Sequence, residues 1–156
     1  AQLDRFLMRL SLGYPDHENE VAILTRQMKE HPITRVSPVT DPDGVARLQA
    51  AVADVHVDES LKDYIVRVVE ATRTHPAARL GASPRGSLGL MRASQAFAAI
   101  EGRNFLIPDD VKALAPAVLC HRIVLRPDAR ARGATPQEVI DEVLRAVPVP
   151  LAAERL

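Results

Sequence analysis

Apolar residues recur at helical spacing along most of the chain, and the clearest repeat lies near its middle. Six positions there follow the i, i+3, i+4, i+7, i+8, i+11 spacing of one buried helix face. These positions are Leu61, Tyr64, Ile65, Val68, Val69 and Thr72. Asp58 stands where an N-cap is expected, and His75-Pro76 ends the repeat. The pattern predicts an amphipathic helix between Asp58 and His75.

Start signals divide the rest of the chain into further helices. At each one a capping residue, a proline or both precede a helical stripe of apolar residues. They occur at Asp16, Asp41, Ser83, Pro108 and Thr135. The last is a capping box, because Glu138 follows the cap at the third helical position. Together with the helix after Asp58, these signals predict five or six helices joined by proline-rich turns.

Two short segments have the pattern of strands instead. Apolar residues alternate from Phe6 to Leu12, which is the period-two signature of a half-buried strand. The apolar run Ile123-Val124-Leu125 is a second, shorter extended piece. The fold class predicted from these patterns is therefore all-α, a helical bundle of five or six helices with a short N-terminal strand.

Composition supports helical packing and limits the classes of partner. Hydrophobic residues make up 47% of the 156 residues and aromatic ones only 3%, so the apolar content rests on Leu, Val, Ile and Ala. The 20 Lys and Arg balance the 20 Asp and Glu, which argues against a nucleic-acid partner. No apolar run reaches about 18 residues, so no membrane span is expected. The single cysteine, Cys120, excludes an internal disulfide and favours a cytoplasmic location.

The segment from Gly81 to Gly86 is the strongest candidate for chemistry. Ser83-Pro84 predicts a helix N-terminus, where unpaired N–H groups and the helix dipole attract anions. Arg85 lies in the first turn, where a cation is unfavourable by about 0.3–1 kcal/mol unless a negative group offsets it. A bound phosphate would supply that charge. The alternative is that Arg85 is a solvated surface residue or pairs with a nearby carboxylate.

Other catalytic and metal-binding motifs are not found in the sequence. Gly81 and Gly86 have the spacing of a P-loop, but Ser87 stands where the lysine is required and no strand pattern precedes Gly81. The five histidines follow no metal-ligand spacing, so no metal site is expected. The paired acids lie at predicted helix starts, where carboxylates complement the dipole. Any nucleotide phosphates must therefore be bound without a P-loop from this chain.

The chain contains, in this order, Ala1–Met8 with Leu12–Pro15, Gly81–Arg85, Ile107–Val111, His121–Ile123 and Val147–Pro150. Together these segments resemble the C-terminal part of MoxR-type AAA+ ATPases. The resemblance implies that residues 1–15 end the α/β ATPase core, leaving the N-terminal strand, that residues 16–150 form the helical lid, and that residues 151–156 are a C-terminal tail. The chain begins with Ala1 rather than Met, so we expect it to start inside a longer protein whose P-loop lies upstream.

The same resemblance implies roles for individual residues. Arg85 corresponds to the sensor 2 arginine, which reaches the γ-phosphate of the bound nucleotide, and Ser83 and Pro84 lie with it in the nucleotide-contacting turn. Arg5, in Leu3-Asp4-Arg5-Phe6, resembles an arginine finger that acts in trans on a neighbouring subunit. Gly86 departs from the family, where we expect alanine, and costs up to about 1 kcal/mol of helix propensity.

The implied function is that of a lid in an ATPase that uses ATP and Mg²⁺. Such proteins form homo-oligomeric rings, usually hexamers, and carry out chaperone-like remodelling or cofactor insertion in client enzymes, often with a von Willebrand factor A-domain partner. This chain alone is expected to be inactive. The alternative is a non-enzymatic helical regulatory or DNA-binding module, although the helix after Asp58 offers only Lys62 and Arg67 outside its apolar stripe. The N-terminal strand, if unpaired, could also pair with a second copy of the chain.

Overall fold

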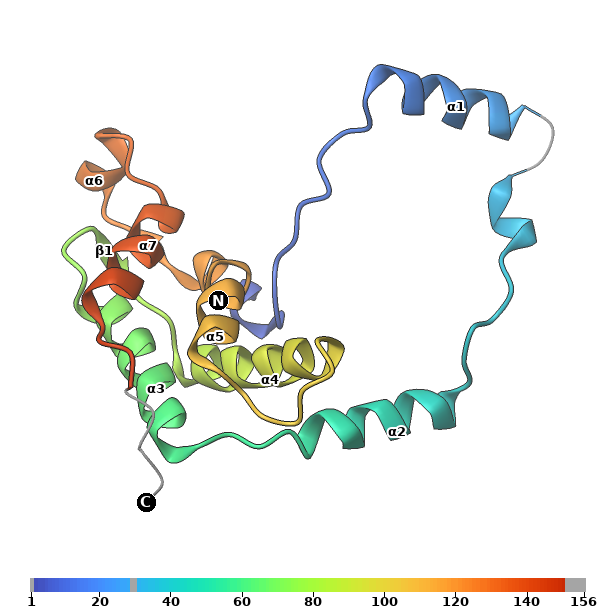
Figure 1. Ribbon diagram of the computed structural model, residues 1–156. Helices are drawn as coiled ribbons and strands as arrows, with labels where there is room; N and C mark the ends of the chain where they lie inside the picture. Colours follow the sequence, from blue (N-terminus) through green and yellow to red (C-terminus); the bar gives the residue numbers. More distant parts are fainter. Residues whose placement is uncertain (1, 29–30, 151–156) are drawn as a thin grey trace. The chain divides into compact units, whose positions relative to one another are not determined.

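The computed structural model describes residues 2–28 and 31–150, and it confirms the all-α class predicted from the sequence. These residues form seven α-helices, three short 3-10 helices and one two-stranded sheet (Figure 1). The chain folds into two compact units. The smaller contains Leu10–Leu48, and the larger combines the residues up to Arg9 with those from Gln49 onward.

The smaller unit contains α1 (His17–Gln27), η2 (Pro32–Arg35) and the first turns of α2 (Pro42–Ala53). Asp16 caps α1 by accepting a hydrogen bond from the Asn19 backbone N–H at 2.8 Å. Asp41 caps α2 in the same way, from the Gly44 N–H at 2.6 Å. Both predicted start signals are confirmed, yet no residue of α1 is buried.

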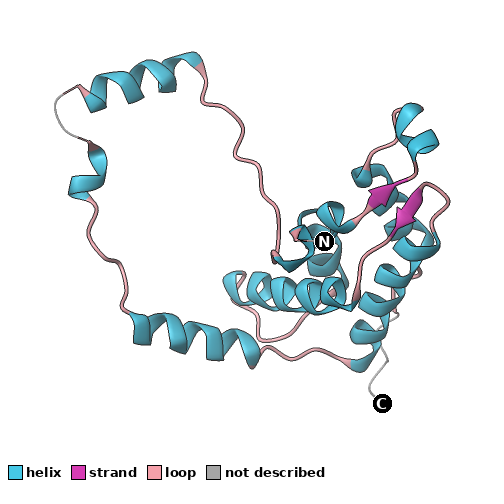
Figure 2. Cartoon of the chain, turned by 180° about the vertical axis from the view of Figure 1, so that it is seen from behind, coloured by secondary structure: helices cyan, strands magenta, loops and turns pink. Residues whose placement is uncertain are grey.

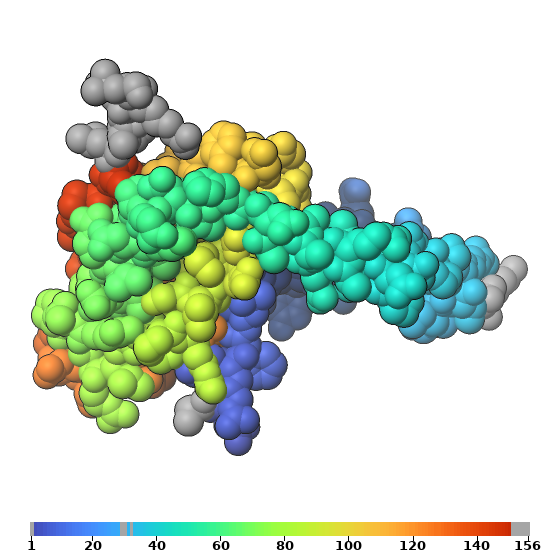
Figure 3. All heavy atoms as spheres, turned by 90° about the horizontal axis from the view of Figure 1, so that it is seen from below, coloured from blue at the N-terminus to red at the C-terminus, as the bar shows by residue number. Residues whose placement is uncertain are grey.

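The larger unit is a bundle of four main helices around one core. They are α3 (Glu59–Thr74), α4 (Pro84–Ile100), α5 (Pro108–Leu119) and α7 (Pro136–Ala146). α4 packs along α5, and α3 contacts α4, α5 and α7. The space-filling view shows α3 in green against α4 in yellow-green (Figure 3). All six residues of the stripe predicted for α3 are buried, which confirms that helix and its orientation.

A short sheet and a short helix complete this unit. β1 (Ala78–Leu80) pairs antiparallel with β2 (Val124–Leu125), as Figure 2 shows in magenta. The extended piece at 123–125 predicts β2. The expectation that no strand precedes Gly81 is wrong, because β1 ends at Leu80; its three residues have no apolar alternation that would have indicated a strand. α6 (Pro127–Ala131) follows β2 and was also not predicted, since a five-residue helix carries too little periodicity.

The strand predicted from Phe6 to Leu12 is wrong for the described chain. η1 (Leu3–Arg5) precedes this segment, which continues as extended chain without pairing to a strand. The Phe6 carbonyl instead accepts hydrogen bonds from Arg122 and His121. Alternation shows that a segment can be half buried, but a strand also needs a ladder of backbone hydrogen bonds to a neighbouring strand. Here the segment is held instead by side chains of Arg122 and His121 and by one bond from the Arg9 N–H to the Ala117 carbonyl in α5.

Candidate functional site

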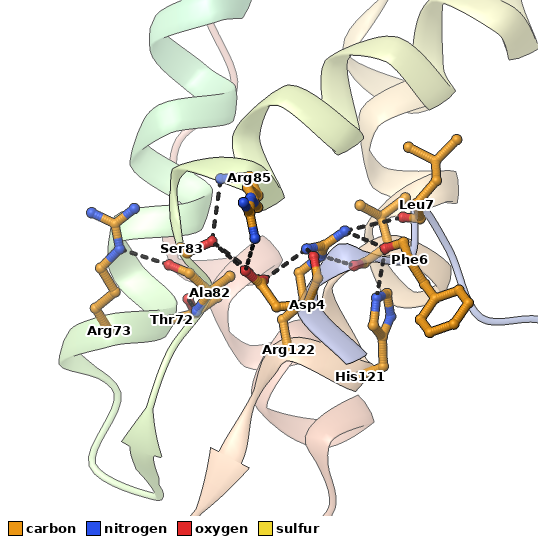
Figure 4. A network of polar contacts seen from close by, with 11 residues as sticks. Asp4, Phe6, Leu7, Thr72, Arg73, Ala82, Ser83, Arg85, His121 and Arg122 are labelled. Atoms are coloured by element: carbon orange, nitrogen blue, oxygen red, sulfur yellow. Dashed lines mark hydrogen bonds and ion pairs between the residues drawn. The ribbon is translucent and has the colours of Figure 1, made fainter. Parts of the chain in front are cut away.

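The loop that leads into α4 is bound tightly to α3. The Ala82 N–H donates to Thr72 Oγ1 at 3.0 Å, and Arg73 Nε donates to the Ala82 carbonyl at 2.8 Å (Figure 4). A Cβ on Gly81 would lie 2.5 Å from the Arg73 backbone nitrogen, so only glycine lets the loop pass this close to the backbone of α3. The loop therefore sets the position of the α4 N-terminus relative to α3.

The first turn of α4 has the cap that the sequence predicts. Ser83 Oγ accepts a hydrogen bond from the Arg85 backbone N–H at 3.2 Å, and Pro84 occupies the first turn. A Cβ on Gly86 would lie 3.0 Å from Ala82 Cβ and 3.2 Å from Leu119 Cδ2. Close packing of this turn against the loop and α5 thus accounts for glycine where the resemblance led us to expect alanine.

The Arg85 guanidinium lies at the surface beside a carboxylate. Its side chain is 63% exposed, and Nη1 is 3.9 Å from Asp4 Oδ2, at the outer limit of an ion pair. The alternative reading of Arg85, as a residue paired with a nearby carboxylate, therefore holds in the described chain. The pair is loose, so most of the guanidinium is still open to an incoming anion.

Asp4 receives most of its contacts from other residues. Arg122 Nη1 donates to Asp4 Oδ1 at 2.8 Å, and Ser83 Oγ donates to the same carboxylate at 3.0 and 3.2 Å. Burial raises the pKa of Asp4, but hydrogen bonds from Arg122 and Ser83 and the charges of Arg122 and Arg85 outweigh it. The net result is a pKa below the ordinary aspartate value, so Asp4 carries its negative charge at neutral pH.

Arg122 is the buried residue that holds the N-terminal segment. Its side chain is 3% exposed, and its Nε donates to the Val118 carbonyl at 2.8 Å. Nη1 donates to the Asp4 carbonyl and carboxylate, and Nη2 donates to the carbonyls of Phe6 at 2.6 Å and Leu7 at 3.3 Å. One guanidinium thus binds residues 4–7 to the end of α5 and to η3 (Cys120–Arg122).

These residues surround a pocket of about 730 Å³ that is rich in arginine. Its cationic lining residues are Arg5, Arg73, Arg79, Arg85 and Arg122, and Asp4 is the only carboxylate among the lining residues that the structure describes. Leu3, Leu80 and Val124 add an apolar side. Within the described part of the chain, Arg5 and Arg79 form no ion pair. The charges of these guanidinium groups, of which Arg85 and Arg5 are exposed, are suited to an anion carrying several negative charges.

The structure brings together the predicted site residues and adds two more. Ser83, Pro84 and Arg85 share the first turn of α4, and Arg5 lines the same pocket. Asp4 and Arg122 received no role from the sequence, although both lie in segments that carry the family resemblance. Their pairing depends on a contact between residues 118 positions apart, which no local pattern reveals.

The single cysteine of the chain, Cys120, is partly buried. Burial, with a smaller effect from Asp141, raises the pKa of the Cys120 thiol to about 11, so it is not a reactive thiolate at neutral pH. No group of three His, Cys, Asp or Glu side chains is placed to hold a metal between residues 2 and 28 or 31 and 150. In the same ranges, no helix has the length and apolar character needed to cross a bilayer.

Comparison with known proteins gives a consistent set of relatives. Residues 70–143 match the AAA lid domain family. YeaC of Bacillus subtilis is 45% identical over 97% of this chain and 47% of its own length. The protein named Chaperone MoxR1 of Mycobacterium tuberculosis is 39% identical over 96% of this chain and 42% of its own length. The chain thus spans a little under half of these relatives.

A solved structure is similar over almost the whole chain. It is the crystal structure of a candidate ATPase from Cytophaga hutchinsonii, which is 30% identical to this chain. The two superpose with a TM-score of 0.86 over 96% of this chain and 48% of the other.

Proposed function

Since the chain belongs to the MoxR-type AAA+ proteins and carries their lid domain, we propose that it is the nucleotide-sensing lid of an ATPase. The observation that carries the proposal is the exposed guanidinium of Arg85 on the first turn of α4, inside an arginine-rich pocket. A γ-phosphate has the charge and geometry that such a guanidinium binds best. Arg85 would then act as sensor 2, with Ser83 and Pro84 shaping the turn that presents it.

The chain's residues fit a polyphosphate but not a magnesium ion. Arginines supply donors for phosphate oxygens, whereas Mg²⁺ needs free oxygen ligands. Asp4 is the one carboxylate among the described lining residues, and it already accepts hydrogen bonds from Arg122 and Ser83. ATP and Mg²⁺ would therefore be held mainly by a P-loop that this chain lacks. The isolated 156-residue chain should show no ATP turnover. Reproducible turnover that Arg85→Ala abolishes would contradict this expectation.

Arg5 has the exposure that an arginine finger requires. It follows Asp4 directly, lines the pocket and forms no ion pair among the described residues. We place it at the nucleotide of a neighbouring subunit in a homo-oligomeric ring, usually a hexamer. Residues 1–15 would then close the ATPase core and residues 16–150 form the lid, while the proposed tail at 151–156 lies outside the described residues.

The larger function we propose is cytoplasmic, ATP-driven remodelling of client enzymes, with a von Willebrand factor A-domain protein as partner. The name Chaperone MoxR1, given to the Mycobacterium relative, supports this direction. Several arginines gather in one pocket rather than along an exposed helix face, and this favours the lid over a DNA-binding module.

The test compares wild type with Arg85→Ala in the full-length protein. Loss of a guanidinium that stabilises phosphoryl-transfer charge should lower the ATP turnover rate at least tenfold, and by up to about 10³-fold. Folding should be unchanged, and nucleotide affinity should stay within about tenfold of wild type. Arg132→Ala is the control, because Arg132 pairs with Asp128 outside the pocket. Unchanged turnover in Arg85→Ala would overturn the proposal.

A further inference from the structure

Asp4 is a negative charge built into a pocket that is otherwise positive. Its Oδ2 faces Arg85 Nη1 at 3.9 Å, and no other carboxylate lines the pocket within the described chain (Figure 4). We propose that Asp4 is an internal anion that competes with phosphate for Arg85, and that Arg122 positions it. This inference rests on the proposed role of Arg85 as the residue that binds the γ-phosphate.

The two sides of the Asp4–Arg85 pair differ in how firmly they are held. Asp4 is 27% exposed and is held by Arg122 at 2.8 Å and by Ser83 at 3.0 Å. The Arg85 side chain is 63% exposed, and among the described residues its guanidinium pairs with Asp4 alone, at 3.9 Å. The carboxylate is therefore fixed while the guanidinium can turn away. An incoming phosphate would draw Arg85 from Asp4 rather than displace Asp4.

Arg122 cannot itself bind the phosphate. A guanidinium has five N–H donors, and those of Arg122 go to the Val118, Asp4, Phe6 and Leu7 carbonyls and to the Asp4 carboxylate. Its side chain is 3% exposed, so it has neither a spare donor nor access to solvent. Arg122 is thus a positioning residue, and Arg85 is the mobile partner.

The consequence is that Asp4 weakens the binding of any anion at Arg85. Phosphate must replace the contact with Asp4 and also lie near a fixed like charge. Asp4→Asn removes the charge but keeps an oxygen that can accept from Arg122 and Ser83. Because the Asp4–Arg85 contact is long and partly solvated, the variant should bind phosphate about two- to fivefold more tightly.

The experiment is a double-mutant cycle in the full-length protein. The dissociation constant of a non-hydrolysable ATP analogue with Mg²⁺ is measured for wild type, Asp4→Asn, Arg85→Ala and the double variant. Asp4→Asn should tighten binding two- to fivefold in the presence of Arg85 and by a clearly smaller factor in the Arg85→Ala background, where only the repulsion between Asp4 and phosphate is removed. Asp128→Asn, which removes a charge outside the pocket, should bind like wild type.

The outcomes separate the inference from the function on which it rests. If Arg85→Ala leaves turnover unchanged, the proposed function fails. If Arg85→Ala lowers turnover but Asp4→Asn leaves affinity unchanged, or shifts it equally in both backgrounds, only the role of Asp4 is overturned. Asp4→Ser enters the same cycle should Asp4→Asn fail to fold, as judged by circular dichroism.

Discussion

Arg122 and Asp4 show how a few side chains connect distant parts of this chain. Arginine is rarely buried unless its donors are satisfied, and here the N-terminal segment supplies acceptors for both terminal nitrogens. The hydrogen bond from Arg122 also holds the Asp4 carboxylate beside Ser83. The helix start at Ser83-Pro84 indicates from the local sequence that Arg85 is a candidate site residue, whereas no local pattern indicates a role for Arg122.

Protonation of Asp4 should reduce the stability of the chain at acid pH. The pKa of Asp4 in the folded chain lies below the ordinary aspartate value of about 3.9. The charged carboxylate therefore stabilises the folded state fully above that ordinary value. This stabilisation is lost as the pH falls below about 4 and through the folded-state pKa. Melting temperatures between pH 6 and pH 2.5 should show wild type above Asp4→Asn at pH 6, with the gap closing below pH 4. A gap that does not change with pH would contradict this.

Among the secondary-structure elements, helices were far easier to predict than strands. Six of the helices begin at a signal within a few residues of the helix itself, as with Asp58 before α3 and Thr135 before α7. A cap bond joins residues two or three apart, as in Asp58 with Ser60 and Glu138 with Thr135. β1 depends instead on pairing Ala78 with Leu125, so its existence follows from the folded bundle.

Two glycines at the start of α4 should respond differently to alanine. In Gly81→Ala the new Cβ would be 2.5 Å from backbone atoms of α3, so the loop must shift at a cost of about 1–3 kcal/mol or more. In Gly86→Ala the tight contact with the Ala82 methyl is offset by about 1 kcal/mol of helix propensity, so the net change should be near zero. Urea unfolding measures both. Equal losses in the free energy of unfolding would show that the close approach of the loop to α3 does not require glycine at position 81.

At the level of the complete chain, the core belongs to one unit. Its members, from Val55 to Val143, all lie in the unit that contains α3 to α7. By contrast, the apolar side chains of the smaller unit are largely exposed, including Leu24 at 68% and Met28 at 81%. Burial of apolar surface therefore stabilises the larger unit, and none of the described members of this core comes from Leu10–Leu48.

Replacement of residues 10–48 should leave the larger unit folded. A glycine–serine linker of the same length keeps the loop-closure entropy nearly constant while it removes α1, η2 and the first turns of α2. The melting temperature should change by no more than a few degrees, because no member of the core is removed. Differential scanning calorimetry tests this. Loss of the cooperative transition would show that the smaller unit supports the core.

Local chemistry along the chain was enough to predict the all-α class, most helix starts and the buried stripe of α3. Each of these depends on contacts within one or two helical turns. Resemblance to a family marked Arg85 and Arg5, whose roles are still predictions. The extended course of residues 6–12, the β1–β2 pair and the Asp4–Arg122 contact follow only from folding. These features depend on contacts between residues far apart in the sequence. Buried backbone groups and charges need hydrogen-bond partners, and only the packing of the helices decides which partners lie within reach.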